Sequence, residues 1–135
     1  MDDGYTTVRM DRMNQLHPIR GEVWRVNFDP SVGDEICKIR PVVVMSVGDV
    51  GLLQLRVIVP ITGWNPKYER YTRMVQLYPA ESNGMTKISS ADTFQIASMS
   101  LLRFQEKIGS LETSEVEEIA ESITLTIGYS LPQPA

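Results

Sequence analysis

The sequence predicts a mainly β fold, in which a small, strongly bent antiparallel sheet or barrel is closed on one side by a C-terminal α-helix. Two patterns carry this prediction. Short apolar and β-branched segments bounded by turn formers recur through the first 110 residues, and one segment with helical periodicity follows them. We expect a single domain at 19–130, between a polar, flexible N-terminal extension (1–18) and a short tail (131–135).

The predicted strands follow one another along the chain. We expect them at 21–27, 41–47, 54–61, 73–78 and 103–108, with a further extended stretch at 87–97 that breaks near Ala91 and Asp92, and a helical turn at 98–102. Turn formers mark reversals at 48–51, at 79–84 and at Gly109, and longer loops fill 29–39 and 63–72. The segments 41–47 and 54–61 are apolar on both faces, so we expect both strands to be buried.

The last segment has the spacing of an amphipathic helix. Its apolar residues recur at i, i+3, i+4 and i+7 and form one face: Val116, Ile119, Ala120, Ile123 and Ile127. Two starts fit equally well, either Thr113 as the cap or Ser114 with Glu117 in a capping box. Gly128 is expected to end the helix.

The composition excludes several classes of protein. No apolar run approaches the roughly 20 residues of a membrane helix, and no secretory pattern opens the chain, so we expect a cytoplasmic protein without membrane association. One cysteine and one histidine make neither a disulfide nor a structural zinc site, and we expect no metal and no cofactor. The net charge is −4, but the last 24 residues hold five Glu and no Lys or Arg, which leaves +1 for a body that can face a polyanion.

A predicted hairpin brings two polar residues together at one end of the sheet. If the strands at 41–47 and 54–61 pair around a turn near Val50, the numbers of opposed residues sum to about 101. The numbers of Arg40 and Thr62 sum to 102, so these residues lie side by side with Cβ atoms about 5 Å apart. The loops at 29–39 and 63–72 leave from that same end.

Both loops carry residues suited to RNA binding. The first contributes Glu35 and Lys38. The second holds three cations and three aromatic residues, with Glu69 opposing the cations, in the run Trp64, Asn65, Lys67, Tyr68, Arg70, Tyr71 and Arg73. Cations follow a phosphate backbone and aromatic faces stack on unpaired bases. The alternative is a solvated loop with its rings packed back on the sheet, and composition alone slightly favours that alternative.

The residue types at the strand ends fit a phosphodiester site. The Arg40 guanidinium stays protonated and offers a planar fork to phosphate oxygens. The Thr62 hydroxyl can donate to a developing oxyanion, and the Glu35 carboxylate can take a proton from an attacking hydroxyl. The alternative is structural, with Arg40 paired to Glu35 or Asp34 and Thr62 as an ordinary strand end. Sequence geometry alone leaves the two interpretations equal.

Five motifs follow one another at characteristic spacings: Gly21-Glu22-Val23-Trp24, Phe28-Asp29-Pro30, Gly33-x-Glu35, Lys38-x-Arg40-Pro41-Val42-Val43-Val44 and Val59-Pro60-Ile61-Thr62. They resemble the MazF/PemK family of toxin endoribonucleases from toxin–antitoxin modules. The end of the chain is similar as well, with a last strand at 101–109 and an acidic helix from 111. The resemblance spans about 19–127, is specific in the N-terminal half and is not specific at 63–86.

The resemblance implies a small SH3-like barrel with an added helix, working as a homodimer and bound by a cognate antitoxin. It implies metal-independent, sequence-specific cleavage of single-stranded RNA, in which the 2′-hydroxyl attacks its own phosphate and leaves a 2′,3′-cyclic phosphate. Arg40 and Thr62 match the catalytic pair of that family, and Glu35 matches an acidic position of its motif. Asp92 resembles the Asp of the family's Asp-Gln segment.

One region departs from the family. Many members carry an Arg three residues after that Asp and a basic residue shortly before it, where this chain has Gln95 and Ser90. If Gln95 faces the phosphate, the missing charge slows cleavage, and Gln95→Arg is expected to raise the rate. If Gln95 reads a base, the same change alters which sequences are cut.

Three other functions remain as alternatives. The first is a catalytically weakened family member that acts as a binding protein. The second is a topoisomerase poison like the related CcdB toxins, which cut nothing and would not need Arg40 and Thr62. The third is an adaptor that binds proline-rich peptides through an aromatic groove of Trp64, Tyr68 and Tyr71, which leaves Glu35 and Arg40 unexplained.

Overall fold

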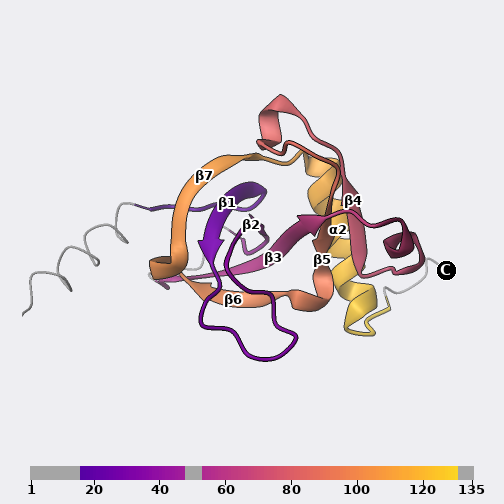
Figure 1. Cartoon of the computed structure of the whole chain (residues 1–135), viewed down its shortest axis with the longest axis horizontal. Helices are drawn as coiled ribbons and strands as arrows, with labels where there is room; N and C mark the ends of the chain where they lie inside the picture. Colours follow the sequence, from indigo (N-terminus) through magenta and orange to yellow (C-terminus); the bar gives the residue numbers. More distant parts are fainter. Residues whose placement is uncertain (1–15, 48–52, 131–135) are drawn as a thin grey trace, which may run out of the picture.

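The computed structural model describes residues 16–47 and 53–130 (Figure 1). They form a seven-stranded antiparallel sheet and one C-terminal helix, which confirms the predicted fold class. The hydrogen-bonded order is β4-β5-β3-β2-β1-β7, and β6 pairs with the first part of β3. The strands are β1 (Glu22–Asn27), β2 (Ile39–Val44), β3 (Leu55–Gly63), β4 (Met74–Leu77), β5 (Ser89–Asp92), β6 (Ala97–Ser100) and β7 (Phe104–Ser110).

The sheet curves strongly around its own interior, as Figure 1 shows, but it remains open. Within the described ranges, no pairing joins the end strands β4 and β7. The word barrel therefore applies loosely, while the predicted bent antiparallel sheet is confirmed.

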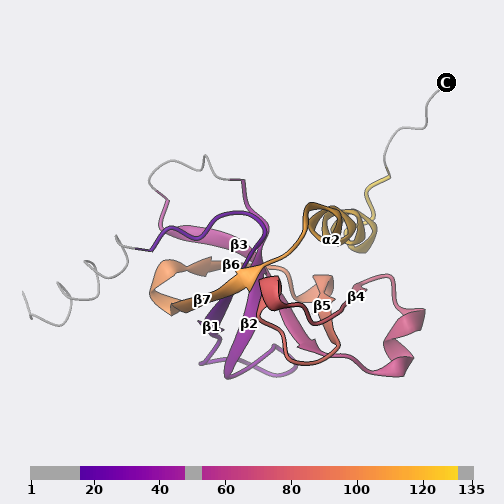
Figure 2. The same cartoon turned by 90° about the horizontal axis from the view of Figure 1, so that it is seen from above.

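The central strands bury both faces, as their uninterrupted apolar sequences predict. On one face, Val43 and Ile61 belong to a core that packs against α2 (Thr113–Thr126), which lies beside the sheet in Figure 2. On the other face, Val42 belongs to a second core around Trp24 and Phe104, whose rings meet edge to face at 5.8 Å. The sheet thus separates two cores, and the second one leads to the loop between β1 and β2.

Both caps predicted for the helix are wrong. The buried residue Leu111 donates its N–H to the Gly21 carbonyl at 2.8 Å, which holds the chain on the sheet up to that point. Glu112 therefore becomes the cap position, and its N–H donates to the Glu115 carboxylate at 3.0 Å. Gly128 follows the helix with a left-handed φ of 78°, as expected for a helix end. The outer surface of α2 carries exposed carboxylates at Glu117, Glu118 and Glu121.

Several element boundaries also differ from the prediction. The expected helical turn at 98–102 is the end of β6 followed by the 3-10 turn η4 (Leu101–Arg103). Gly109 lies inside β7 and not in a turn, because this part of β7 passes close to the backbone of η2 (Glu81–Asn83). Arg40 and Thr62 lie inside β2 and β3, since these strands continue past the hairpin to pair with β1 and β5. The predicted turn at 48–51 lies outside the described residues.

The last residues of the expected N-terminal extension pack on the sheet. Leu16 contacts the second core, and Pro18 is buried with its carbonyl accepting from Arg56 Nε at 2.9 Å. Residues 1–15 and 131–135 lie outside the described ranges, so the expected domain limits stay predictions. Over 16–47 and 53–130, no helix combines the length and apolarity needed to cross a membrane.

We expect Glu22→Gln to destabilise the protein in a pH-dependent way. The Glu22 carboxylate accepts from the Ile19 N–H (2.9 Å) and the Trp24 indole N–H (3.1 Å) and pairs with Lys107 Nζ at 2.8 Å. Burial raises the pKa of Glu22, but the bonds from Lys107, Ile19 and Trp24 outweigh it and lower that pKa below its ordinary value. The carboxylate therefore stabilises the fold above its unfolded pKa, and this contribution is lost as the pH falls through the folded pKa.

Urea denaturation of both proteins at pH 7 and at pH 3 checks this expectation. The variant should lose about 1–2 kcal/mol of unfolding free energy at pH 7, and the difference should shrink at pH 3. A difference that is the same at both pH values would contradict the role given to the charge.

Candidate functional site

The end of the β2–β3 pair carries two of the candidate residues. The register pairs Val42 with Pro60, so opposed numbers sum to 102, one more than the predicted 101. The pairing ends at Val42 and Pro60, and the same register extended by two residues would place Arg40 opposite Thr62. Because side chains alternate along a strand, Arg40 shares the face of Val42 and Thr62 shares the face of Pro60. Both are half-buried, and the Arg40 Nε donates to the Cys37 carbonyl at 3.3 Å.

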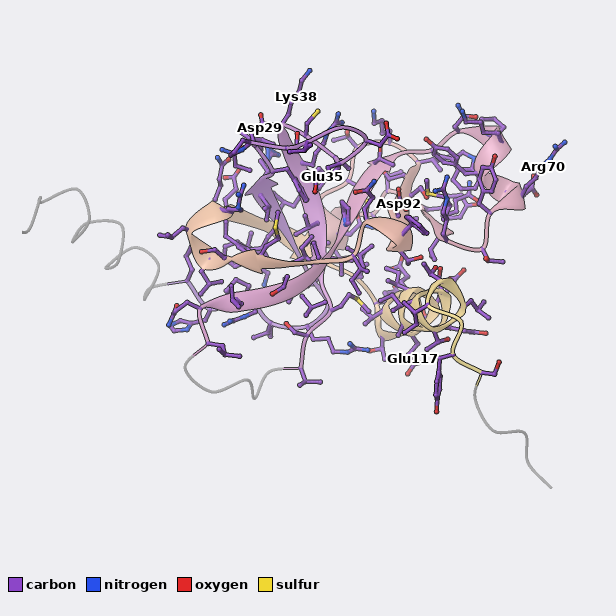
Figure 3. All side chains as sticks on the ribbon, turned by 90° about the horizontal axis from the view of Figure 1, so that it is seen from below. Asp29, Glu35, Lys38, Arg70, Asp92 and Glu117 are labelled. Carbon is purple, nitrogen blue, oxygen red and sulfur yellow. The ribbon has the colours of Figure 1, made fainter. Side chains whose placement is uncertain are left out.

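The loop between β1 and β2 carries Glu35 and Lys38. Lys38 has a left-handed φ of 67°, and its N–H donates to the Asp29 carboxylate at 3.0 Å. Glu35 is exposed, and its carboxylate accepts from the Val32 N–H at 2.6 Å. Figure 3 shows the Lys38 side chain extending away from the molecule, above Glu35. The loop therefore folds on itself and presents a cation outward and a carboxylate inward.

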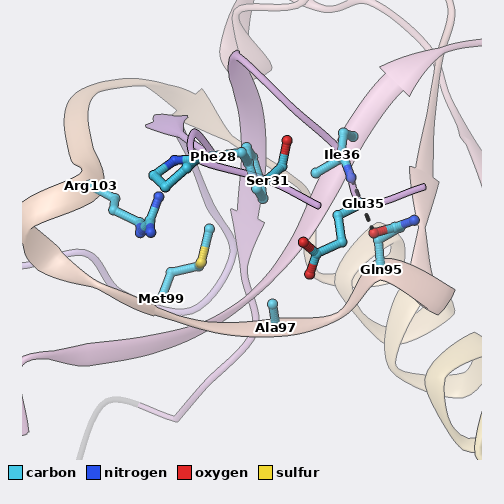
Figure 4. A pocket seen from close by; sticks show the side chains of 9 residues that line it. Phe28, Ser31, Glu35, Ile36, Gln95, Ala97, Met99 and Arg103 are labelled. Atoms are coloured by element: carbon cyan, nitrogen blue, oxygen red, sulfur yellow. Dashed lines mark hydrogen bonds between the residues drawn. The ribbon is translucent and has the colours of Figure 1, made fainter. Parts of the chain in front are cut away.

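A pocket of about 160 Å³ lies between this loop and β6. The Glu35 carboxylate points into it, and Arg103 lies on the opposite side (Figure 4). Apolar side chains form much of the remaining wall, contributed by Phe28, Ile36, Ala97 and Met99. The pocket thus places a carboxylate and a guanidinium around an apolar interior.

The short turn η3 (Thr93–Gln95), between β5 and β6, is fixed by buried hydroxyl groups. The Thr93 hydroxyl bonds to the Arg73 carbonyl at 2.8 Å and meets the hydroxyls of Ser122 and Thr126 on α2, each at 2.9 Å. The Ser122 hydroxyl also donates to the Thr72 carbonyl. The segment leading into β4, the turn η3 and α2 are therefore held together at this point.

Asp92 caps η3 and is half-buried. Its carboxylate accepts from the Phe94 N–H at 3.1 Å. Burial raises the pKa of Asp92, and the bonds from Phe94 and Gln95 backbone groups and the nearby Arg73 charge offset this only in part. The capping bond holds the Asp92 carboxylate at the start of η3, where it lies near the charge of Arg73.

Arg73 lies between two aromatic rings. Its guanidinium carbon is 5.0 Å from the centre of the Tyr71 ring and 5.8 Å from that of Phe94. The rings are 43% and 64% exposed, so an aromatic and cationic surface borders Asp92. Such a surface is suited to stacking with unpaired bases.

The other candidates of the second loop belong to a separate turn that follows β3. The Asn65 side chain accepts from the Lys67 N–H at 3.1 Å and so begins the 3-10 turn η1 (Pro66–Arg70). Trp64 and Tyr68 meet edge to face at 5.9 Å, which packs these rings within the loop. Lys67 and Arg70 are exposed, and in Figure 3 Arg70 lies far from Glu35 and Asp92. The structure therefore brings Arg73, but not Arg70, next to Asp92.

Comparison with known proteins decides the family. The model of the PemK-like, MazF-like toxins of type II toxin–antitoxin systems matches residues 19–127. This chain belongs to that family.

The relatives of this PemK/MazF family member include endoribonuclease MazF9 of Mycobacterium tuberculosis, which is 27% identical over 118 residues, covering 78% of this chain and 92% of that protein. Among solved structures, MazF from Deinococcus radiodurans has a TM-score of 0.71 at 22% identity, covering 84% of this chain and 99% of that one. A mycobacterial endoribonuclease in complex with its cognate antitoxin has a TM-score of 0.67 at 15% identity, covering 85% and 99%. The last two show the fold.

Two features of this PemK/MazF family member were not predicted from its sequence. Arg103 donates to the carbonyls of Asn27 (3.1 Å) and Asp29 (2.9 Å), which fixes the start of the β1–β2 loop. Gln95, for which the sequence predicts an RNA contact, bonds to backbone groups of that loop. No local pattern reveals either role, because the partners lie 59 to 76 residues away in the chain.

Proposed function

We propose that this protein is a toxin of a toxin–antitoxin module that cleaves single-stranded RNA in the cytoplasm without a metal. The observation that carries the proposal is the location of Arg40 and Thr62 at the end of the β2–β3 pair from which the loop of Glu35 departs. Membership of the PemK-like, MazF-like family and the relative named endoribonuclease MazF9 support it. A topoisomerase poison or an adaptor would have no use for this set of groups.

The proposed reaction is an attack of the ribose 2′-hydroxyl on its own phosphate. Glu35 accepts the proton of that hydroxyl, and the new bond from the 2′-oxygen to phosphorus forms as the bond from phosphorus to the 5′-oxygen breaks. The Arg40 fork and the Thr62 hydroxyl bind the phosphate oxygens as charge develops on them. The 5′-oxygen takes a proton from water, so the products are a 2′,3′-cyclic phosphate and a 5′-hydroxyl.

We propose that RNA runs from this centre across η3 towards the second loop. The aromatic surface of Tyr71, Arg73 and Phe94 supports this direction, since stacking needs no particular base sequence. Residues with a proposed role in RNA binding are Lys38, Trp64, Asn65, Lys67, Arg70, Arg73 and Asp92.

The proposed partners are a cognate antitoxin and a second copy of the chain. A cationic surface that binds RNA also suits an acidic segment of an antitoxin, which would then compete with RNA. A homodimer agrees with the exposed apolar residues of β3, where Leu55 is 43% and Val57 is 36% exposed.

RNA cleavage is expected to survive excess EDTA. Within 16–47 and 53–130, no three His, Cys, Asp or Glu side chains are grouped as a metal site. The test incubates purified protein with a mixed-sequence RNA, with and without EDTA, and identifies the new ends. The expected result is equal cleavage in both samples and 2′,3′-cyclic phosphate ends.

Two outcomes would contradict the proposal. Cleavage that stops in EDTA and returns with added Mg²⁺ would assign the chemistry to a metal. The absence of cleavage in both samples, with folded protein, would favour a toxin that acts by binding alone.

A further inference from the structure

The Gln95 side chain connects η3 to the β1–β2 loop through both ends of its amide. Its Nε2 donates to the Asp34 carbonyl at 3.2 Å, and its Oε1 accepts from the Ile36 N–H at 3.5 Å. The second bond is drawn in Figure 4. Asp34 and Ile36 are the two neighbours of Glu35, so the amide holds the backbone immediately before and immediately after the proposed general base.

Gln95 is itself attached to a fixed part of the fold. The Thr93 hydroxyl, two residues earlier, bonds to the Arg73 carbonyl and to the hydroxyls of Ser122 and Thr126. Asp92 adds a cap through the Phe94 N–H. Through η3, the Gln95 amide therefore links the loop to α2 and to the segment leading into β4.

The loop supplies only a local contact to the Glu35 carboxylate. That contact is the bond from the Val32 N–H at 2.6 Å, which lies three residues away within the same loop. A bond inside the loop fixes the side chain relative to the loop but not relative to Arg40 and Thr62. The two bonds from Gln95 fix the position of the loop relative to the sheet. In Figure 4, the Glu35 carboxylate points into the pocket beside Gln95.

We propose that Gln95 is a positioning residue that clamps the backbone on both sides of Glu35 and thereby fixes where the Glu35 carboxylate lies relative to the sheet that carries Arg40 and Thr62. This rests on the proposed function, in which Glu35 is the general base. A primary amide suits the task because it both donates and accepts, whereas arginine has donors only.

The first measurement tests the clamp without using activity. Hydrogen exchange of the Ile36 amide is compared in the parent and in Gln95→Met, which keeps side-chain length and removes both bonds. We expect exchange to become about 2- to 10-fold faster in the variant, the range for loss of one hydrogen bond. The control is Thr124→Val, which removes a side-chain bond to the Glu121 carbonyl on α2, and it should leave Ile36 exchange unchanged. Unchanged exchange in Gln95→Met would overturn the clamp.

The second measurement tests positioning. With RNA as substrate, Gln95→Met should lower kcat about 10- to 100-fold with KM changed less than about 3-fold, because a misplaced base affects the chemical step more than binding. The parent's own cleavage tests the proposed function separately. Faster exchange with unchanged kcat would show that the clamp exists but positions nothing.

A double-mutant cycle separates positioning from a general structural effect. If Gln95 acts through Glu35, then Gln95→Met should have little further effect in a Glu35→Gln background. If the losses in kcat from the two substitutions were additive, Gln95 would not act through Glu35. Gln95→Arg keeps the donor to the Asp34 carbonyl and loses the acceptor for the Ile36 N–H, so the clamp predicts a lower rate. A higher rate would overturn the clamp and favour a phosphate contact.

Discussion

Replacing Arg40 by Ala is expected to lower RNA cleavage by at least about 10²- to 10³-fold while leaving the fold intact. The guanidinium is the charged group of the proposed centre that can bind two phosphate oxygens at once, and its planar fork matches them. Its own structural bond is a single long one, to the Cys37 carbonyl at 3.3 Å. Single-turnover cleavage measures the effect, and circular dichroism and the urea midpoint verify folding.

Two further variants define what Arg40 contributes. Arg40→Lys keeps the charge and loses the fork, so it should restore part of the rate. Arg25→Ala is the matched control, because Arg25 lies on the neighbouring strand β1 opposite Pro41 and forms an exposed ion pair with Glu106 at 3.3 Å. Exposed pairs contribute little, so this variant should keep both stability and cleavage. A folded Arg40→Ala protein of normal activity would remove Arg40 from the centre.

A large effect on stability is expected for Gly109→Ala, with a loss of about 3 kcal/mol or more of unfolding free energy. A methyl group at Gly109 would lie 2.6 Å from the Ser82 carbonyl oxygen and 2.7 Å from Asn83 Cα. The turn cannot move aside, because the buried Asn83 amide bonds to the backbone of Tyr78, Ala80 and Met85 at 2.9–3.0 Å. Urea denaturation measures the loss.

Gly128→Ala separates crowding from backbone strain. Gly128 has a φ of 78° but nothing within 4 Å of an added methyl group, so its substitution should cost only about 1 kcal/mol. Equal losses at Gly109 and Gly128 would mean that the contact between β7 and η2 does not limit stability.

The sequence predicts the hairpin well because its signals are local. Two apolar segments with a turn between them set the register to within one residue, and the observed sum of 102 is the one that pairs the numbers of Arg40 and Thr62. The helix face is likewise set by a period of 3.6 residues, and Val116 and Ile119 are buried as predicted. The prediction was wrong for Ile127, which follows the end of α2 and is exposed. Signals of this kind depend on neighbours in the chain and need no knowledge of the whole fold.

The features that were not predicted from the sequence depend on contacts between segments that are far apart in the chain. Gly109 reads as a turn in sequence, yet its constraint comes from η2, more than 20 residues earlier. The caps of α2 were wrong because the bond from Leu111 to the Gly21 carbonyl sets where the chain leaves the sheet. The bonds of Gln95 to the β1–β2 loop are a long-range contact that no local pattern predicts. In each case the deciding contact joins segments that are far apart in the chain.

The carboxylates along the outside of α2 give the molecule an electrically one-sided surface. In Figure 3, Glu117 lies on the side opposite Lys38 and Glu35, and Glu118 and Glu121 belong to the same exposed surface of α2. These carboxylates repel a polyanion that approaches from the helix side, so we expect RNA to make its first contact elsewhere on the molecule. This repulsion weakens as salt shortens its reach to about 10 Å at 0.1 M.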